Sequence, residues 1–395
     1  MKKLLSIGLC TLLIVMISGC SQSGALYQDG RKSFENKNYE DAAAFFASAI
    51  EDNPNRADYY IDYGLTLIKL GRYEEALAEF DQAYVNKENI IVSRNNKRVY
   101  RGRGIAYYYM ADYENSIQEF NKALELGESS DLNQDILQYV GSAQMALGYY
   151  EKAIKTYSDL LKISSKCTEA YNSRALCYRY LGEYDKSMKD YDKAIALEPR
   201  QYSNYFGKYY LLEERGDTTT AGEVLTKAAK IEVKTGEDKY QLAKIHYYQG
   251  DYEKALSELN GSFTEGFQEA YYYIGEIYRI KKDYPKAIYY YEIFIKEGNV
   301  LSPNVYNQIA VCEMKGGNYD AALKYLEKGI AIHHAGVQKI LLMNEIITYE
   351  SLGEYSRAKD KMDEYLSLYP KEDQIIKEAG FIDTRLIKAE IPVEE

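Results

Sequence analysis

The chain has 395 residues, of which 28% are charged and 46% hydrophobic, a composition that excludes intrinsic disorder as its general state. The 60 acidic residues outnumber the 49 basic ones and give a formal charge of −11, so we expect no nucleic-acid partner. With 6 Pro, no Trp and 44 Tyr, the composition favours long helices that use one aromatic residue repeatedly.

The first element in chain order is an apolar run over residues 4–17 that follows two lysines. Its 14 residues are fewer than the roughly 20 that a membrane-spanning helix needs. A charged start followed by a short apolar run is typical of a signal peptide, which we place at residues 1–19. No later apolar stretch approaches spanning length.

The apolar run ends in Ile17-Ser18-Gly19-Cys20, which resembles the lipobox of bacterial lipoproteins. The resemblance implies that Cys20 carries a diacylglycerol group and that residues 20–24 form a short tether. Two acyl chains anchor a protein stably, because each buried methylene contributes about 0.8 kcal/mol. We therefore expect an extracytoplasmic protein of the bacterial cell envelope, attached to the membrane by lipid. The alternative is an ordinary secretory signal whose cleavage site happens to precede a Cys.

The rest of the chain is organised around a recurring Tyr that is usually followed by an acidic residue. Successive anchors lie 32–40 residues apart, with one exception. The interval between Tyr184 and Tyr252 is 68 residues, and Thr218 stands where the anchor between them would be. The anchor tyrosines are Tyr39, Tyr73, Tyr113, Tyr150, Tyr184, Tyr252, Tyr284, Tyr319 and Tyr355. Ten units therefore fill the chain.

Residue types also recur at fixed distances from each anchor. A small residue usually stands nine before it. Ala or Ser stands three after it, a large residue seven after it and often Ala ten after it, and these last three offsets lie on one helical stripe. Pro54, Pro199 and Pro370 stand fifteen after an anchor, where proline ends a helix. Each unit is therefore predicted to be a helix-turn-helix.

This pattern resembles the tetratricopeptide repeat family. The resemblance implies an all-α fold, a right-handed superhelical solenoid of about ten repeats over residues 25–370, closed by a capping helix and tail at 371–395. The unit of Thr218 departs most from the pattern, and we expect a bend there. Longer spacings at 86–97 and 127–133 predict extended loops.

Residues that could carry chemistry are few. His333 and His334 are adjacent and point about 100° apart on a helix, and His246 is two units away, so we expect no metal site. Cys167 and Cys177 lie about 15 Å apart along one predicted helix, too far for a disulfide, and we expect free thiols. No phosphate-binding loop or nucleophile elbow is present. We expect no cofactor and no enzymatic activity.

The family resemblance implies that the inner wall of the solenoid binds ligands, and that it is formed by residues 4, 5, 8, 12 and 15 before each anchor. One candidate set comes from the units of Tyr113 and Tyr184: Arg98, Arg101, Tyr108, Tyr109, Asn172, Arg179 and Tyr180. A second set comes from the units of Tyr252 and Tyr284: Tyr240, Lys244, Tyr247, Tyr272 and Arg279.

Two interpretations of these sets remain open. The cations and rings could bind an acidic or carboxylate-terminated peptide. Alternatively, the arginines neutralise neighbouring acids and the tyrosines fill ordinary repeat positions. Some family members grip a terminal carboxylate with Asn eight before the anchor, but no unit here has Asn in that position.

We therefore predict a lipid-anchored scaffold for protein-protein interactions, with a protein or peptide partner of unknown identity. The alternative is a glycan- or solute-binding lipoprotein that uses groove tyrosines as stacking platforms. Assembly through the outer face or the ends of the solenoid also remains open.

Overall fold

The computed structural model describes residues 22–85, 90–127, 130–262, 266–298, 302–332, 335–370 and 373–390. All regular structure in these ranges is helical. The chain divides into two compact units, Met1–Pro199 and Arg200–Glu395. None of the described helices is both long enough and apolar enough to cross a membrane.

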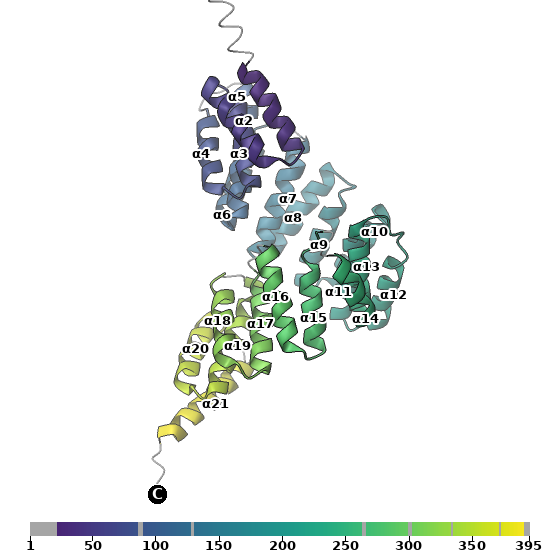
Figure 1. The fold of residues 1–395 in the computed structure, drawn as a ribbon, viewed down its shortest axis with the longest axis vertical. Helices are drawn as coiled ribbons and strands as arrows, with labels where there is room; N and C mark the ends of the chain where they lie inside the picture. The colour runs from purple at the N-terminus through teal and green to yellow at the C-terminus, as the bar shows by residue number, and fades with distance from the viewer. Residues whose placement is uncertain are drawn as a thin grey trace, which may run out of the picture. The chain divides into compact units, whose positions relative to one another are not determined.

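In the described residues of the first unit the helices form five hairpins (Figure 1). Its helices are residues 22–35, α2 (Tyr39–Asp52), α3 (Ala57–Lys69), α4 (Tyr73–Ala83), α5 (Ile90–Tyr109), α6 (Tyr113–Glu125), α7 (Ser130–Ala146), α8 (Tyr150–Ile163), α9 (Thr168–Tyr180) and α10 (Tyr184–Leu197). Each helix packs against the next one in the chain, and the first helices of neighbouring hairpins also meet, as α3 and α5 do.

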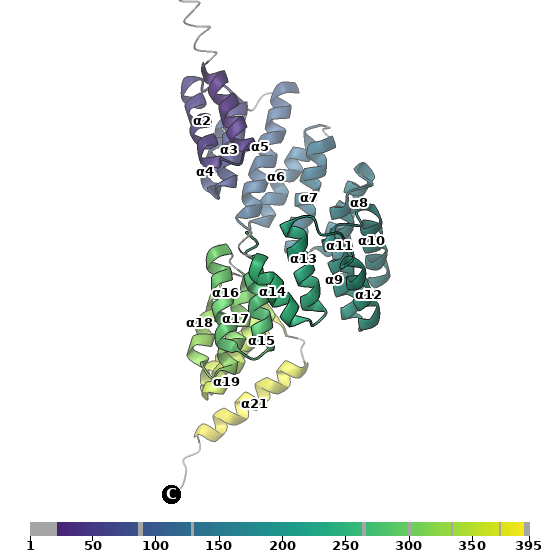
Figure 2. The ribbon, with the colours of Figure 1, turned by 45° about the vertical axis from the view of Figure 1, so that its right-hand side comes forward.

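The described part of the second unit adds five more hairpins and one final helix (Figure 2). They are α11 (Tyr202–Glu214), α12 (Thr218–Ala228), α13 (Gly236–Tyr248), α14 (Tyr252–Ser262), α15 (Ala270–Ile280), α16 (Tyr284–Gly298), α17 (Pro303–Lys315), α18 (Tyr319–Ile330), α19 (Ala335–Leu352), α20 (Tyr355–Leu368) and α21 (Asp373–Glu390). The predicted all-α solenoid of ten helix-turn-helix repeats is confirmed. The unit boundary falls just before the hairpin of Thr218; the bend expected there stays a prediction.

The turn inside every hairpin has one residue in the left-handed region, two positions before the anchor. Gly71 is one example, with φ 75°. The amide of the next residue, Arg72, donates to the carbonyl of Leu67 at 2.9 Å. This is the six-to-one bond of a glycine C-cap, and it ends the first helix of the hairpin. Seven units have Gly at this position, and the other three have Lys37, Ala111 and Lys282.

The small residue nine before the anchor packs against the large residue seven after it. A Cβ built on Gly104 would lie 2.7 Å from the ring of Phe120, and one built on Gly64 would lie 2.7 Å from the ring of Phe80. The two helices of a hairpin therefore approach so closely that the ring lies against bare backbone. This contact explains the spacing found in the sequence.

Residues 86–97 and 127–133 were expected to be extended loops, and that expectation is wrong for the greater part of both. The extra residues lengthen helices instead, since α5 has 20 residues and α7 has 17, against 13 in α3. The cause is Lys97, which is only 2% exposed and whose Nζ donates to Gly127 O at 2.6 Å and to Asn133 Oδ1 at 2.7 Å. These bonds tie α5 to the start of the next hairpin.

The start of the described chain differs from the predicted tether. Residues 22–24, expected to belong to an extended tether, are helical, and Ser23 is only 1% exposed. Packing of the first hairpin therefore starts earlier than the repeat pattern indicated. At the other end α21 packs against α20, with Ile382 fully buried. Cys20 lies outside the described residues.

The described histidine and cysteine side chains form neither a metal-binding group nor a disulfide. His246 is buried and its Nδ1 lies 2.6 Å from Glu258 Oε2, while His333 and His334 lie outside the described residues. No group of three metal-ligating side chains occurs in the part of the chain that is described. Cys167, Cys177 and Cys312 are free thiols, and burial raises the pKa of Cys177 and of Cys312 to about 12.

Candidate functional site

The first unit has a cavity of about 440 Å³ between the first helices of its first three hairpins. Its lining comes from the helix over 22–35, α2, α3 and α5, and consists of Tyr27, Arg31, Phe34, Glu35, Phe46, Asp62, Leu65 and Arg98. All of these except Phe46 and Asp62 stand 4, 5, 8, 12 or 15 residues before an anchor, which are the inner-wall positions. The cavity therefore opens on the predicted binding face.

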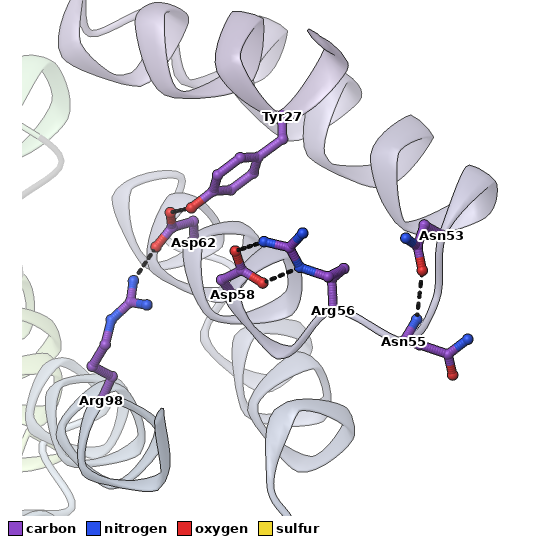
Figure 3. A network of polar contacts seen from close by, with 7 residues as sticks. All are labelled: Tyr27, Asn53, Asn55, Arg56, Asp58, Asp62 and Arg98. Atoms are coloured by element: carbon purple, nitrogen blue, oxygen red, sulfur yellow. Dashed lines mark hydrogen bonds and ion pairs between the residues drawn. The ribbon is translucent and has the colours of Figure 1, made fainter. Parts of the chain in front are cut away.

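Asp62 connects the two sides of the cavity (Figure 3). Its Oδ2 accepts a hydrogen bond from the hydroxyl of Tyr27 at 2.5 Å, and its Oδ1 pairs with Nη2 of Arg98 at 2.5 Å. Burial and the hydrogen bond to Asp62 raise the pKa of Tyr27, so its hydroxyl keeps its proton. Three helices thus hold one donor, one carboxylate and one guanidinium in a fixed arrangement.

Aromatic rings form the apolar part of the wall. The ring of Tyr27 stacks on Tyr59 with centroids 4.7 Å apart and lies 5.7 Å from Phe46. Phe34 meets Tyr39 edge-on at 5.4 Å. Because these rings pack on one another, the apolar wall is rigid and needs little ordering when a ligand binds.

The charges around the cavity are mixed. Arg31 and Glu35 are both exposed and lie 3.9 Å apart, a weak pair that a ligand can displace at small cost. Arg98 and Asp62 are more buried and bonded to each other. The cavity therefore offers an apolar surface for one or two side chains, with exposed groups of both signs at its edge.

Of the predicted residues in this unit, only Arg98 lines the cavity. Arg101 pairs through Nε with Asp135 Oδ2 at 2.5 Å. Tyr108 packs against Tyr139 at 5.3 Å, and burial raises its pKa. Arg98 and Arg101 thus have carboxylate partners within the chain, as the second interpretation of the sequence expected for the arginines.

The remaining candidates of the first set lie outside the cavity, Tyr109 on α5 and the other three on α9. Tyr109 and Tyr180 are exposed, and each stacks on the anchor tyrosine of the preceding hairpin, Tyr73 at 6.0 Å and Tyr150 at 4.7 Å. The guanidinium of Arg179 lies 5.8 Å from the ring centre of Tyr180, and Asn172 is half-buried on α9.

The second candidate set lies in the second unit and surrounds Lys244. The ammonium nitrogen of this lysine is 4.6 Å from the ring centre of Phe206 and 5.4 Å from those of Tyr240 and Tyr273. No carboxylate among the described residues lies within ion-pair distance of it. Burial lowers the pKa of Lys244, while the more distant Glu237 and Glu269 act in the opposite direction.

The other members of the second set converge on Glu276, which is buried. Arg279 donates to it at 2.7 Å, the hydroxyl of Tyr247 donates at 3.5 Å, and the hydroxyl of Tyr291 donates as well. Tyr272 packs against Tyr291 with ring centres 5.9 Å apart. Arg279 is therefore neutralised within the chain, and Lys244 differs from it in lacking such a partner.

Most of the cavity residues were not singled out from the sequence, although the same offsets reach them. Tyr27, Arg31, Phe34 and Glu35 stand 12, 8, 5 and 4 before Tyr39, and Leu65 stands 8 before Tyr73. The predicted candidates lie in later units because arginines are concentrated at the inner-wall positions there. Applying the inner-wall offsets to the first two units would have identified this face.

Comparison with protein families gives matches described as tetratricopeptide repeat. They cover residues 33–83, 98–128, 137–167, 168–201, 240–300 and 303–332, together more than half of the chain. The interval between 201 and 240 holds the unit of Thr218.

Relatives found by sequence share about a quarter of their residues with this chain over the aligned parts. An Hsp70-Hsp90 organizing protein of Triticum aestivum is 25% identical over 45% of this chain and 36% of its own length. The TPR repeat-containing protein MJ1428 of Methanocaldococcus jannaschii is 23% identical over 80% of this chain and 52% of its own length. The chain thus spans about half or less of these relatives.

Among solved structures, yeast Tom70 has a similar fold. The TM-score is 0.53 at 14% sequence identity, covering 95% of this chain and 97% of that one. At this identity the similarity concerns the fold alone.

Proposed function

Because the chain belongs to the tetratricopeptide repeat family, we propose that it is a scaffold that binds a segment of a partner protein in the inner-wall cavity of its first unit. The observation that carries the proposal is the lining of this cavity, in which packed rings and Leu65 lie beside exposed Arg31 and Glu35. Such a surface suits an extended or helical peptide with one or two apolar side chains and flanking charges.

We further propose that Cys20 carries lipid and holds the protein on the extracytoplasmic side of a bacterial membrane. The support for this step is the residue pattern of the first twenty positions. A scaffold fixed in this way would recruit its partner to the membrane surface. Relatives named as organizing proteins of other proteins are compatible with a recruiting role.

The cavity favours a peptide over a glycan. A glycan site of the kind considered above would need a row of exposed tyrosine faces with few apolar neighbours. In the cavity the Tyr27 ring packs against Tyr59 and Phe46, and its hydroxyl donates a hydrogen bond to Asp62. The remaining wall is apolar and arginine-containing, which is the arrangement expected of a peptide channel.

The proposal is tested by crosslinking in intact cells, purification and identification of the captured proteins by mass spectrometry. Arg31→Glu reverses a charge at the rim of the cavity, and we expect it to lose the partner. Arg357→Glu is the matched control, because Arg357 is also exposed and also pairs with a nearby glutamate, at 2.8 Å. Capture that is equal in both variants would contradict binding at the cavity.

The lipid anchor is tested separately: Cys20→Ala should release the protein from the membrane fraction.

A further inference from the structure

The start of α5 exposes two neighbouring isoleucines. Ile90 is 88% exposed and Ile91 66%, whereas Val99, further along the same helix, is fully buried. They belong to the extra residues that make α5 longer than α3, so the repeat itself does not require them. Two adjacent exposed isoleucines at one helix end are an apolar surface that nothing in the described part of the chain covers.

Next to these isoleucines lies a second cavity, of about 430 Å³, which combines apolar and cationic walls. Its apolar lining includes Val85, Ile91 and Val92, and its cations are Arg56, Arg94 and Arg98. Arg56 is held by Asp58 through two bonds of 3.0 and 2.7 Å, and Arg98 by Asp62 (Figure 3). Arg94 is exposed and makes no ion pair with any residue that the structure describes.

This surface lies close to the proposed lipid attachment site, as the length of the intervening chain shows. Tyr27 lines the same cavity and lies five residues after the start of its helix at residue 22. That part of the helix is about 7.5 Å long. Cys20 is two residues further, which adds at most about 7 Å. Lipid on Cys20 would therefore keep the cavity within about 15 Å of the attachment point.

We propose that the surface formed by Ile90, Ile91 and Arg94 docks on the phospholipid bilayer that carries the anchor. The isoleucines enter the boundary between headgroups and acyl chains, and the guanidinium of Arg94 bonds lipid phosphate. The protein as a whole, with a charge of −11, is not attracted to an anionic bilayer, so contact needs a local surface of this kind. The inference rests on the proposed lipid attachment at Cys20.

The chain contains no Trp, so one introduced Trp reports its own surroundings. The full-length lipoprotein with Ile91→Trp is reconstituted in vesicles of phosphatidylethanolamine and phosphatidylglycerol, with or without bromine on the acyl chains. We expect a blue shift of the emission and a loss of intensity with the brominated lipid. Ile163→Trp is the matched control, since Ile163 is an exposed isoleucine at the end of α8 in the same unit. Its emission should stay unchanged.

Vesicle flotation of the same samples separates the two proposals. Protein that floats without quenching of Ile91→Trp is anchored but not docked, and this result overturns the inference while the anchor stands. Protein that does not float has no lipid anchor, and both proposals fail. Adding Arg94→Glu to Ile91→Trp should weaken the quenching; unchanged quenching would remove Arg94 from the docking surface. Circular dichroism checks that each variant keeps its helices.

Discussion

At the scale of single residues, the inner-wall cations differ in how their charge is balanced. Arg98 and Arg101 each bond a carboxylate of a neighbouring helix, and Arg279 bonds Glu276 three residues earlier on its own helix. Lys244 instead lies among three aromatic rings. The rings attract the ammonium, whereas burial removes water from it and lowers the pKa of Lys244 against the opposing charges of Glu237 and Glu269.

This balance gives a prediction about stability and pH. A lysine whose pKa is lower in the folded state binds fewer protons there than when unfolded, so its charge costs stability at neutral pH. Lys244→Met should therefore raise the free energy of unfolding at pH 7. The gain should shrink as the pH rises through the lowered pKa toward the value near 10.4 of the unfolded chain. Urea unfolding of both proteins between pH 7 and 10.5 measures the difference.

The opposite sign is equally informative. If Lys244→Met lowers the stability at pH 7, the contacts with the rings outweigh the loss of hydration. Lys254→Met serves as control, because Lys254 is exposed on the second helix of the same hairpin. We expect this control to change stability by less than about 0.5 kcal/mol at any pH.

At the scale of the helices, the hairpin is set by local features that recur in the sequence. A small residue usually stands nine before the anchor and a large residue seven after it, and the two pack together. These offsets made the hairpins predictable, whereas the left-handed residue two before each anchor, which is Gly in seven of the ten units, was found only in the structure. The extra residues around positions 90–97 were misjudged because a longer spacing can lengthen a loop or a helix. Burial of Lys97, which decides between them, depends on Gly127 and Asn133 in the next hairpin.

The close contact of Gly104 with Phe120 predicts opposite effects for two Gly→Ala changes. At Gly104 the added methyl would lie 2.7 Å from a fully buried ring, so Gly104→Ala should destabilise the protein. Overpacking costs about 1–3 kcal/mol, which exceeds the gain in helix propensity of about 1 kcal/mol. At Gly222 on α12 no atom lies within 4 Å of the added methyl, apart from its chain neighbours and the backbone of its own helix. Gly222→Ala should stabilise by about 0.5–1 kcal/mol.

Thermal and urea unfolding of the two variants measure both effects. Equal changes in the two variants would show that helix propensity alone decides, and that the ring at position 120 moves aside freely. A loss confined to Gly104→Ala supports the close packing that defines the hairpin.

At the scale of the whole molecule, the fold was predictable and the site only in part. Ten anchors with the same offsets specify the hairpins and the face of each first helix. The offsets do not show where side chains leave space, because that depends on neighbours one and two hairpins away. Arg98 was predicted for the inner wall and lines the cavity, but Asp62, which connects it to Tyr27, occupies none of those offsets.

The measurement that tests the central claim most directly is photocrosslinking from single positions in living cells. A photoreactive amino acid at Glu35 stands at the rim of the cavity, and one at Gln82 stands exposed on α4, away from it. If the cavity binds a partner segment, position 35 should give one discrete crosslinked protein, weakened by Arg31→Glu, and position 82 should give none. The same crosslinks from both positions, or none from position 35 while wild-type protein still captures a partner, would contradict binding in the cavity.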